Sequence, residues 1–344
     1  MNTERYRSWL RYVLALCAHY SGMDLLYRRL SGPGLVILML HRLRDEPDPY
    51  PLSTSRASLR RMVDWLRGRE ALVDLDEGLQ RLATRAPGCT YAITFDDGYR
   101  DNLRLVDPQL GRVPAILYVA TDLIGGDPIW VYRLTHAVEA RTHDHLDLGM
   151  LGLGHFDLAD AAERERLYAQ LPPRLKQLTP EEVEAGEDEV VAQTRPEAAT
   201  AERRDMLDWQ DIRRLDEAGV TIGAHTCNHV LLSRVDDATA RREITGSHDR
   251  IAAETGAPPR HFAYPNGGAA DFTERDVALV REAGFASAAT SIEGINRPGV
   301  DPFRLLRHNV HEERFLAPSG RLSAALFFSE TSGLLGWLRT RRVA

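Results

Sequence analysis

Two adjacent carboxylates stand where a short apolar segment ends. Residues 91–95 are apolar or β-branched, and Asp96, Asp97 and Gly98 follow them directly. If this segment is a buried strand of a parallel sheet, its end lies at the edge where α/β folds build their sites. Adjacent side chains diverge there, so one carboxylate can face a metal ion while the other faces a water molecule. An Asp-Asp-Gly sequence also suits a plain turn, and this motif alone leaves both interpretations open.

A pair of histidines follows another apolar segment. Residues 220–224 run into His225 and His229, and a separation of four residues lets two imidazoles meet one ion. With one carboxylate they form a three-ligand set, which in catalytic zinc sites leaves one position for water. Cys227 lies between them, but its offset of two directs it away from their shared face, and we interpret it as a packed residue. The pattern predicts an open site for a divalent ion, with Zn²⁺ favoured although other first-row ions also suit it.

Two further segments bring polar residues to the ends of apolar runs. Residues 35–40 end at His41, which would be placed for proton transfer at the same edge of the sheet. A single histidine in this position is more often structural, so its role depends on the neighbouring motifs. Tyr264, Pro265 and Asn266 follow another apolar run and could line a substrate groove, the alternative being a plain turn.

Strands and helices alternate in the predicted secondary structure. Strands buried on both faces are expected at 35–40, 91–95, 115–120, 220–224, 261–265 and 285–290. Amphipathic segments lie between them, and two end at Gly219 and Gly284, the residue type expected just after a helix. The alternation predicts a parallel sheet with helical crossovers, either doubly wound or closed into a barrel.

The alternation is interrupted between residues 121 and 205. This segment is polar and acidic, and we interpret it as a helical insertion over one rim of the sheet. Its three histidines, His143, His145 and His155, neighbour charged residues, so we expect them to be solvated and not to bind metal.

Composition limits the class of partner. The chain has 344 residues and a formal net charge of -7, which does not favour binding to nucleic acid. Its three cysteines, at unrelated spacings, indicate neither a disulfide framework nor a cysteine-rich zinc module.

Both ends of the chain combine aromatic residues and leucine with arginine. The first residues fit neither a secretory signal nor a membrane span, so we expect a cytoplasmic protein or one peripheral to the membrane. The apolar positions near the N-terminus recur at helical spacing. They fit a terminal helix packed on the domain, or alternatively a helix that contacts a membrane surface.

These motifs together resemble the polysaccharide deacetylase family, the carbohydrate esterases of family 4 with a NodB homology domain. T-F-D-D-G stands at 94–98 and H-[ST]-x-x-H at 225–229. The resemblance implies a distorted (β/α) barrel with a zinc-like ion held by Asp97, His225 and His229. It also implies that Asp96 is the general base and that the backbone N–H of Tyr99 helps to hold the oxyanion.

The third family motif is only partly present. Many members have F-R-x-P-[YF]-G, whose arginine orients the catalytic aspartate, whereas this chain has F-A-Y-P-N-G with Ala263 in that place. We expect the orienting cation to come from Arg304 or Arg307, in the segment that fits the next barrel strand. Arg260 is a further alternative.

The general acid is the second departure from the common pattern. The C-terminal histidine segment of many members is not evident, and the stretch L-M-L-H-R-L is similar to the first strand of the permuted branch that deacetylates poly-N-acetylglucosamine. The resemblance therefore assigns the acid to His41, with His308 as the alternative.

The resemblance implies a function and a domain order. We expect metal-dependent hydrolysis of the acetamide of N-acetylated amino sugars in an oligosaccharide or a polysaccharide such as an exopolysaccharide, with release of acetate. A lipid-linked amino sugar, deacetylated or deformylated at the membrane surface, and a glycan-binding barrel without activity are the alternatives. The expected order is an N-terminal helical segment (1–34), the barrel (35–315) and a C-terminal helical tail (316–344).

Overall fold

A closed barrel of parallel strands forms the centre of the molecule. The computed structural model describes residues 3–335 apart from 47, 49, 51 and 198–204. Seven strands of this described chain pair in parallel around a ring. In circular order they are β1 (Gly34–Leu40), β11 (Leu305–Asn309), β10 (Ser287–Glu293), β9 (His261–Ala263), β8 (Thr221–Ala224), β5 (Ala115–Val119) and β4 (Cys89–Phe95). The predicted (β/α) barrel is confirmed.

Burial on both faces explains why the strands are visible in the sequence. All seven residues of β1 and all five of β5 are buried, because one face lines the barrel interior and the other packs against helices. Each of the six predicted strand segments overlaps an observed strand. The two-stranded pair β2 (Arg42–Leu43) and β3 (Ser53–Thr54) lies outside the barrel sheet.

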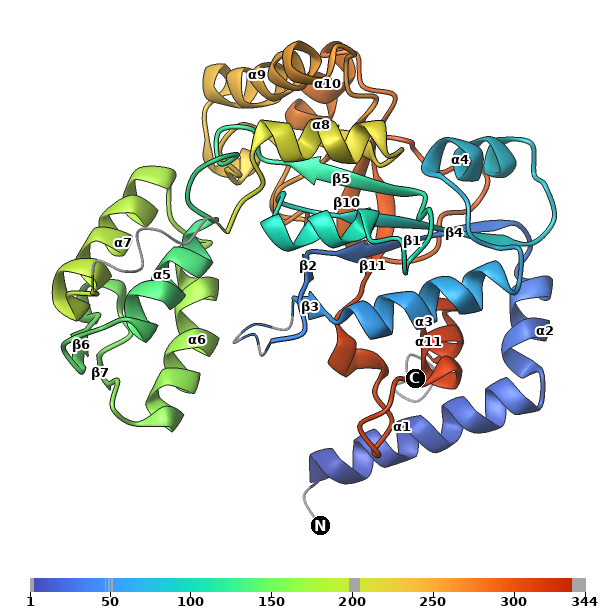
Figure 1. Ribbon diagram of the computed structural model, residues 1–344, viewed down its shortest axis with the longest axis horizontal. Coiled ribbons are helices and arrows are strands. Elements are labelled where there is room, and N and C mark those ends of the chain that lie inside the picture. Colours follow the sequence, from blue (N-terminus) through green and yellow to red (C-terminus); the bar gives the residue numbers. More distant parts are fainter. Residues whose placement is uncertain (1–2, 47, 49, 51, 198–204, 336–344) are drawn as a thin grey trace.

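Helices cover the barrel on opposite sides (Figure 1). The surrounding helices are α3 (Arg56–Arg67), α4 (Leu75–Ala83), α8 (Trp209–Glu217), α9 (Asp237–Thr255) and α10 (Glu274–Glu282). Short 3-10 helices are η1 (Arg100–Val106), η2 (Gly149–Leu151), η4 (Leu232–Arg234) and η5 (Glu312–Phe315). Helix α8 illustrates the local signals: Asp208 and Asp211 form a capping box at its start, and Gly219 follows its end with a φ of 88°.

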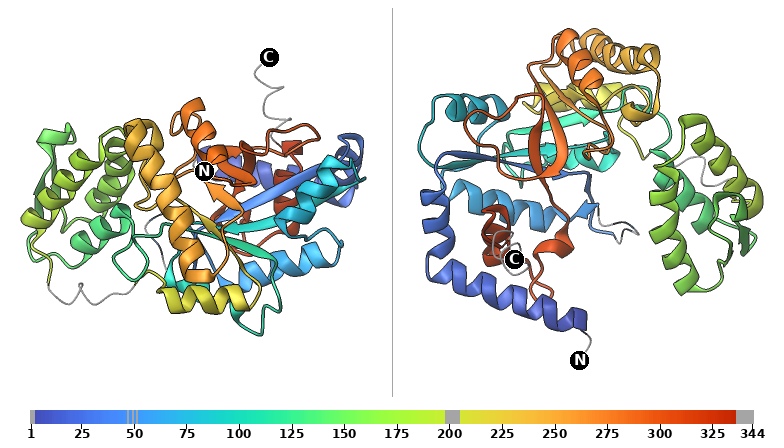
Figure 2. Two further views of the ribbon diagram at one scale, coloured as in Figure 1. Left: turned by 90° about the horizontal axis from the view of Figure 1, so that it is seen from above. Right: turned by 180° about the vertical axis from the view of Figure 1, so that it is seen from behind.

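The predicted insertion forms a lobe to one side of the barrel (Figures 1 and 2). It contains α5 (Trp130–Glu139), β6 (His145–Asp147), β7 (His155–Asp157), α6 (Ala161–Leu175) and α7 (Pro180–Thr194). A small core of its own holds it together, with Leu146 and Phe156 of the hairpin packed among helix leucines. The antiparallel β6–β7 hairpin was not expected from the sequence. His143, His145 and His155 are all exposed.

The terminal helices pack beside the barrel. Helices α1 (Thr3–Tyr20) and α2 (Met23–Leu30) precede β1, and α1 lies against α11 (Ala324–Thr331), where Arg11 and Glu330 form an ion pair. No helix in the described residues has the length and apolar character needed to cross a bilayer. The expected C-terminal tail lies outside the described residues from 336 onward. The domain limits drawn from the sequence stay predictions.

Candidate active site

The carboxyl ends of the barrel strands bring the predicted residues to one rim. His41 follows β1, Asp96 and Asp97 follow β4, and His225 follows β8 directly. Because all seven strands are parallel, these ends meet at the same mouth of the barrel although the chain separates them widely. They line one cavity of about 460 Å³, to which His229 also contributes.

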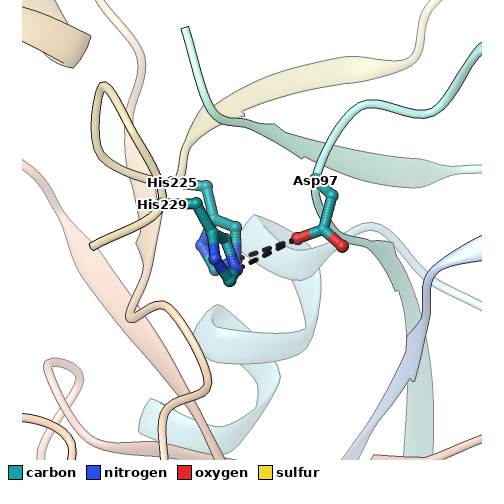
Figure 3. Close-up of side chains that lie close together, drawn as sticks. All are labelled: Asp97, His225 and His229. Carbon is teal, nitrogen blue, oxygen red and sulfur yellow. Dashed lines mark ion pairs between the residues drawn. The ribbon is translucent and has the colours of Figure 1, made fainter. Parts of the chain in front are cut away.

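Asp97, His225 and His229 form a set that fits a metal ion (Figure 3). One ligand atom from each residue lies within 4.8 Å of the others. Asp97 Oδ1 is 3.4 Å from His225 Nε2 and 3.3 Å from His229 Nε2, and it is a buried oxygen without a hydrogen-bond partner in the described chain. Burial opposes the ionisation of Asp97, but the two adjacent imidazoles outweigh it and hold its pKa well below the usual range.

The protonation of His225 suits a metal ligand. Its Nδ1 lies 2.7 Å from the carbonyl oxygen of Ala263, which can only accept a hydrogen bond, so Nδ1 carries the proton. The lone pair of a neutral ring is then on Nε2, the atom that faces Asp97. A hydrogen bond of this kind is what fixes the ring orientation of metal-binding histidines in proteins.

The loops that carry the ligands have a constrained backbone. Asp97, Thr226 and His229 have φ values of 76°, 63° and 55°, in the left-handed region that non-glycine residues rarely occupy. The carboxylate of Glu243, from α9, accepts hydrogen bonds from the backbone N–H groups of Cys227 at 2.9 Å and Asn228 at 2.8 Å. It thereby holds the turn that places both histidines, and its second oxygen accepts from Asn228 Nδ2.

Asp96 is paired with one of the two arginines that the sequence proposed. Arg307 Nη1 and Nη2 lie 2.7 and 2.8 Å from the two oxygens of Asp96, and both side chains are buried. Burial alone would raise the pKa of Asp96, but the guanidinium charge outweighs it and lowers this pKa. Arg307 also donates to the Thr290 carbonyl and to Thr94 Oγ1, so hydrogen bonds to β10 and β4 fix the orientation of its guanidinium group.

The other two arginine candidates lie away from Asp96. Arg304 pairs with Glu274 and Asp301 near the start of β11. Arg260 pairs with Asp76 at the amino end of β9, the opposite end of the barrel from the cavity.

His41 lines the cavity beside the two aspartates. Its Nδ1 is buried and has no hydrogen-bond partner in the described residues. Burial lowers the pKa of His41, against the opposing charges of Asp97 and Asp96. The alternative acid, His308, is buried next to Arg307 on β11 and does not line the cavity. Burial lowers its pKa to about 4.

The backbone N–H of Tyr99 is not used by the neighbouring chain segment. Tyr99 and Met206 form an antiparallel bridge in which the flanking residues exchange the hydrogen bonds, Arg100 N–H to Asp205 and Leu207 N–H to Gly98. In such a pair the N–H of the central residue points away from the partner segment. The Tyr99 N–H is therefore directed away from the bridge, as an oxyanion donor next to Asp97 requires.

Only one of the three groove candidates lines the cavity. Asn266 does so, with a φ of 56°. The Tyr264 side chain is directed into the core instead, where it stacks on Phe272 at a centroid distance of 4.2 Å and donates to the Phe303 carbonyl. Pro265 is also buried outside the cavity lining. The expectation that Tyr264 and Pro265 line the groove is therefore corrected, because both are buried and this segment reaches the cavity only at Asn266, where the backbone bends.

The insertion supplies one wall of the cavity. Its contributions are mostly apolar: Ile129, Trp130 and Val131 at the start of α5, and Pro172 within α6. Lys176, the residue that ends α6, adds a cation, and burial lowers the pKa of its ammonium group against the charges of Asp271 and Asp97. Sequence reasoning placed the insertion over one rim but named none of these residues.

The parallel barrel carries an Asp-His-His set and a second, arginine-bound carboxylate at its rim, as the motifs of the polysaccharide deacetylase family predict. Residues 178–288 match the family model for polysaccharide deacetylase. The family predicted from the motifs is confirmed, and the matched stretch contains both histidines of the metal set. No curated protein matches the chain in sequence.

Solved structures share the fold. The deacetylase PplD of Streptococcus pyogenes, in complex with acetate, aligns with a TM-score of 0.54 at 13% identity over 82% of this chain and 94% of its own. IcaB from Ammonifex degensii aligns with a TM-score of 0.54 at 19% identity over the same shares, 82% and 94%. BC0361, a polysaccharide deacetylase from Bacillus cereus, aligns with a TM-score of 0.54 at 14% identity, over 87% of this chain and 69% of its own.

Glu243 is a positioning residue that sequence reasoning missed, because a glutamate in an amphipathic helix resembles any surface charge. We expect Glu243→Ala to weaken Zn²⁺ binding about 10–100-fold, since the turn between the histidines loses its acceptor. Glu243→Gln, which keeps one oxygen acceptor, should recover part of this loss. Competition with a chromophoric chelator measures the affinity.

The matched control is Glu254→Ala in the same helix, where the carboxylate pairs with Arg213 and Arg250. It should leave Zn²⁺ affinity unchanged. Equal affinity in Glu243→Ala and the wild type would show that the loop keeps its shape without this carboxylate.

Proposed function

We propose that this protein is a metal-dependent deacetylase that hydrolyses the acetamide of N-acetylated amino sugars in a glycan. The single observation that carries the proposal is the meeting of Asp97, His225 and His229 in the cavity that also contains Asp96. The ligand atoms offered are one carboxylate oxygen and two imidazole nitrogens, a donor set of the catalytic zinc type with three protein ligands. Zn²⁺ is the ion favoured, and Asp97, His225 and His229 would hold it.

A bound ion would supply Lewis acidity toward the amide carbonyl and would favour ionisation of water. The carboxylate of Asp96 takes a proton from the attacking water; the two hydrogen bonds from Arg307 orient it, and the guanidinium charge keeps it ionised for this task. The Tyr99 N–H donates to the oxyanion that forms on the carbonyl oxygen. His41 gives a proton to the nitrogen as the carbon–nitrogen bond breaks, so that acetate and a free amine leave.

A lipid-linked amino sugar is the second candidate substrate. The apolar wall from α5 and α6 and the adjacent Lys176 ammonium favour a substrate with an apolar portion and an anionic group, such as a phosphate link. A barrel without activity is disfavoured, because Arg307 occupies the role that the absent motif arginine leaves open and the metal set is complete.

Release of acetate from N-acetylated oligosaccharides and from an N-acetylated glycolipid tests the proposal. We expect activity on at least one substrate, its loss on chelation, its recovery on addition of Zn²⁺, and loss of both metal and activity in Asp97→Ala. Metal content by mass spectrometry and acetate by a coupled assay are the measurements. Metal binding without acetate release from any substrate would support the inactive barrel instead.

The role of His41 depends on the leaving group. Replacement of His41 by alanine should lower kcat on an N-acetyl amino sugar about 10²–10⁴-fold, because the amine cannot leave without a proton. An activated ester such as 4-nitrophenyl acetate needs no such proton, so its hydrolysis should fall far less. Equal losses on both substrates would contradict proton donation by His41, and His308→Ala serves as the comparison variant.

The Arg307–Asp96 pair predicts a shift in the pH profile. In Arg307→Met the pKa of Asp96 should rise, because burial remains while the compensating charge is gone. A base must be ionised to act, so the acid limb of the kcat/KM profile should move to higher pH. Arg307→Lys should show a smaller shift, and Arg304→Ala none. If the acid limb stays in place in Arg307→Met, the group that titrates there is not Asp96.

A further inference from the structure

Exposed apolar side chains are concentrated in the two N-terminal helices. In the described part of the chain ten large apolar side chains are exposed, and seven of them belong to α1 and α2. Trp9 is 58% exposed, Tyr20 81%, Leu26 55% and Leu30 79%. Single exposed apolar residues are normal on a protein surface, but a set this dense marks an interaction site.

These helices are exposed on one side only. Ala15 and Ala18 of α1 are buried, and α1 packs on α11 through Ala15 and the Arg11–Glu330 ion pair. The exposed residues recur at helical spacing, as Trp9 and Tyr20, about three turns apart in α1, and then Met23, Leu26 and Leu30 in α2. Figure 1 shows α1 along the outer side of the molecule, on the far side of α11 from the barrel strands. The exposed stripe is therefore the free face of an anchored helix pair.

The charge of this segment differs in sign from that of the whole chain. Residues 1–30 contain five arginines, at positions 5, 7, 11, 28 and 29, and two acids, Glu4 and Asp24, whereas the chain as a whole carries -7. Asp24 is buried and pairs with His19 and Arg28, and Arg11 pairs with Glu330; five arginines against two acids still leave the segment with a formal charge of +3. An apolar stripe in a basic segment complements an anionic surface.

We infer that α1 and α2 form a docking surface for an anionic lipid bilayer, with the helices lying in the interface. Tryptophan and tyrosine at the stripe's positions 9 and 20 are residue types that favour the boundary between lipid headgroups and acyl chains. Pairing with a second copy would bring two basic segments together, and their like charges oppose that contact. This surface is independent of the chemistry proposed for the barrel.

Vesicle flotation tests the surface. The protein should bind vesicles of phosphatidylcholine with phosphatidylglycerol, bind vesicles of phosphatidylcholine alone at least tenfold less, and lose part of its binding at high salt. The double variant Leu26→Glu/Leu30→Glu should lose at least tenfold in binding, because it places charges on the stripe without touching the packed face.

A matched double variant keeps the comparison specific. Met150→Glu and Val191→Glu change exposed apolar residues of the insertion lobe and should leave vesicle binding unchanged. Thermal unfolding of all variants verifies that each is folded. The inference is overturned if the wild type binds neither vesicle, if Leu26→Glu/Leu30→Glu binds as the wild type does, or if light scattering shows a dimer that this variant dissociates without any vesicle binding.

Discussion

The buried ion pair between Arg307 and Asp96 connects the interior of the barrel to the chemistry at its rim. A carboxylate removed from water needs a partner for its charge, or it becomes protonated and can no longer accept a proton. Arg307 provides that partner from β11, across β1 from the strand that carries Asp96. It also donates to Thr290 and Thr94, so one side chain orients the Asp96 carboxylate and joins three strands.

The residues that could bind a metal ion lie on loops with unusual backbone conformations, and regular elements of the barrel hold these loops in place. Asp97, Thr226 and His229 adopt backbone conformations that cost free energy, of order 1–3 kcal/mol each. The turn between Thr226 and His229 is held by Glu243 of α9, which accepts hydrogen bonds from the N–H groups of residues 227 and 228, and the His225 ring is held by the Ala263 carbonyl of β9. The ligands can therefore lie on loops and still be placed with the accuracy that an ion requires.

Much of this architecture is readable in the sequence, because buried parallel strands leave continuous apolar runs. Whatever follows such a run lies at the same rim, so the association of His41, Asp96 and His225 follows from chain pattern alone. The choice between Arg304 and Arg307 does not follow from the chain pattern, since it depends on where β11 begins and on which of its residues face inward. Tyr264 shows the same limit: its ring packs on Phe272 in the core, whereas Asn266, two residues later, lines the cavity.

What the sequence could not give is contact between distant elements. Glu243 and the Trp130 wall act only through tertiary packing, and neither has a local pattern that distinguishes it from an ordinary helix residue. Residues of the barrel and residues of the insertion contribute differently to the cavity. The barrel strands lead into the Asp-His-His set and Asp96, whereas the insertion contributes Trp130 and Lys176 to the lining of the same cavity. A substitution in the insertion therefore changes the shape or charge of the cavity and leaves the barrel interior as it is.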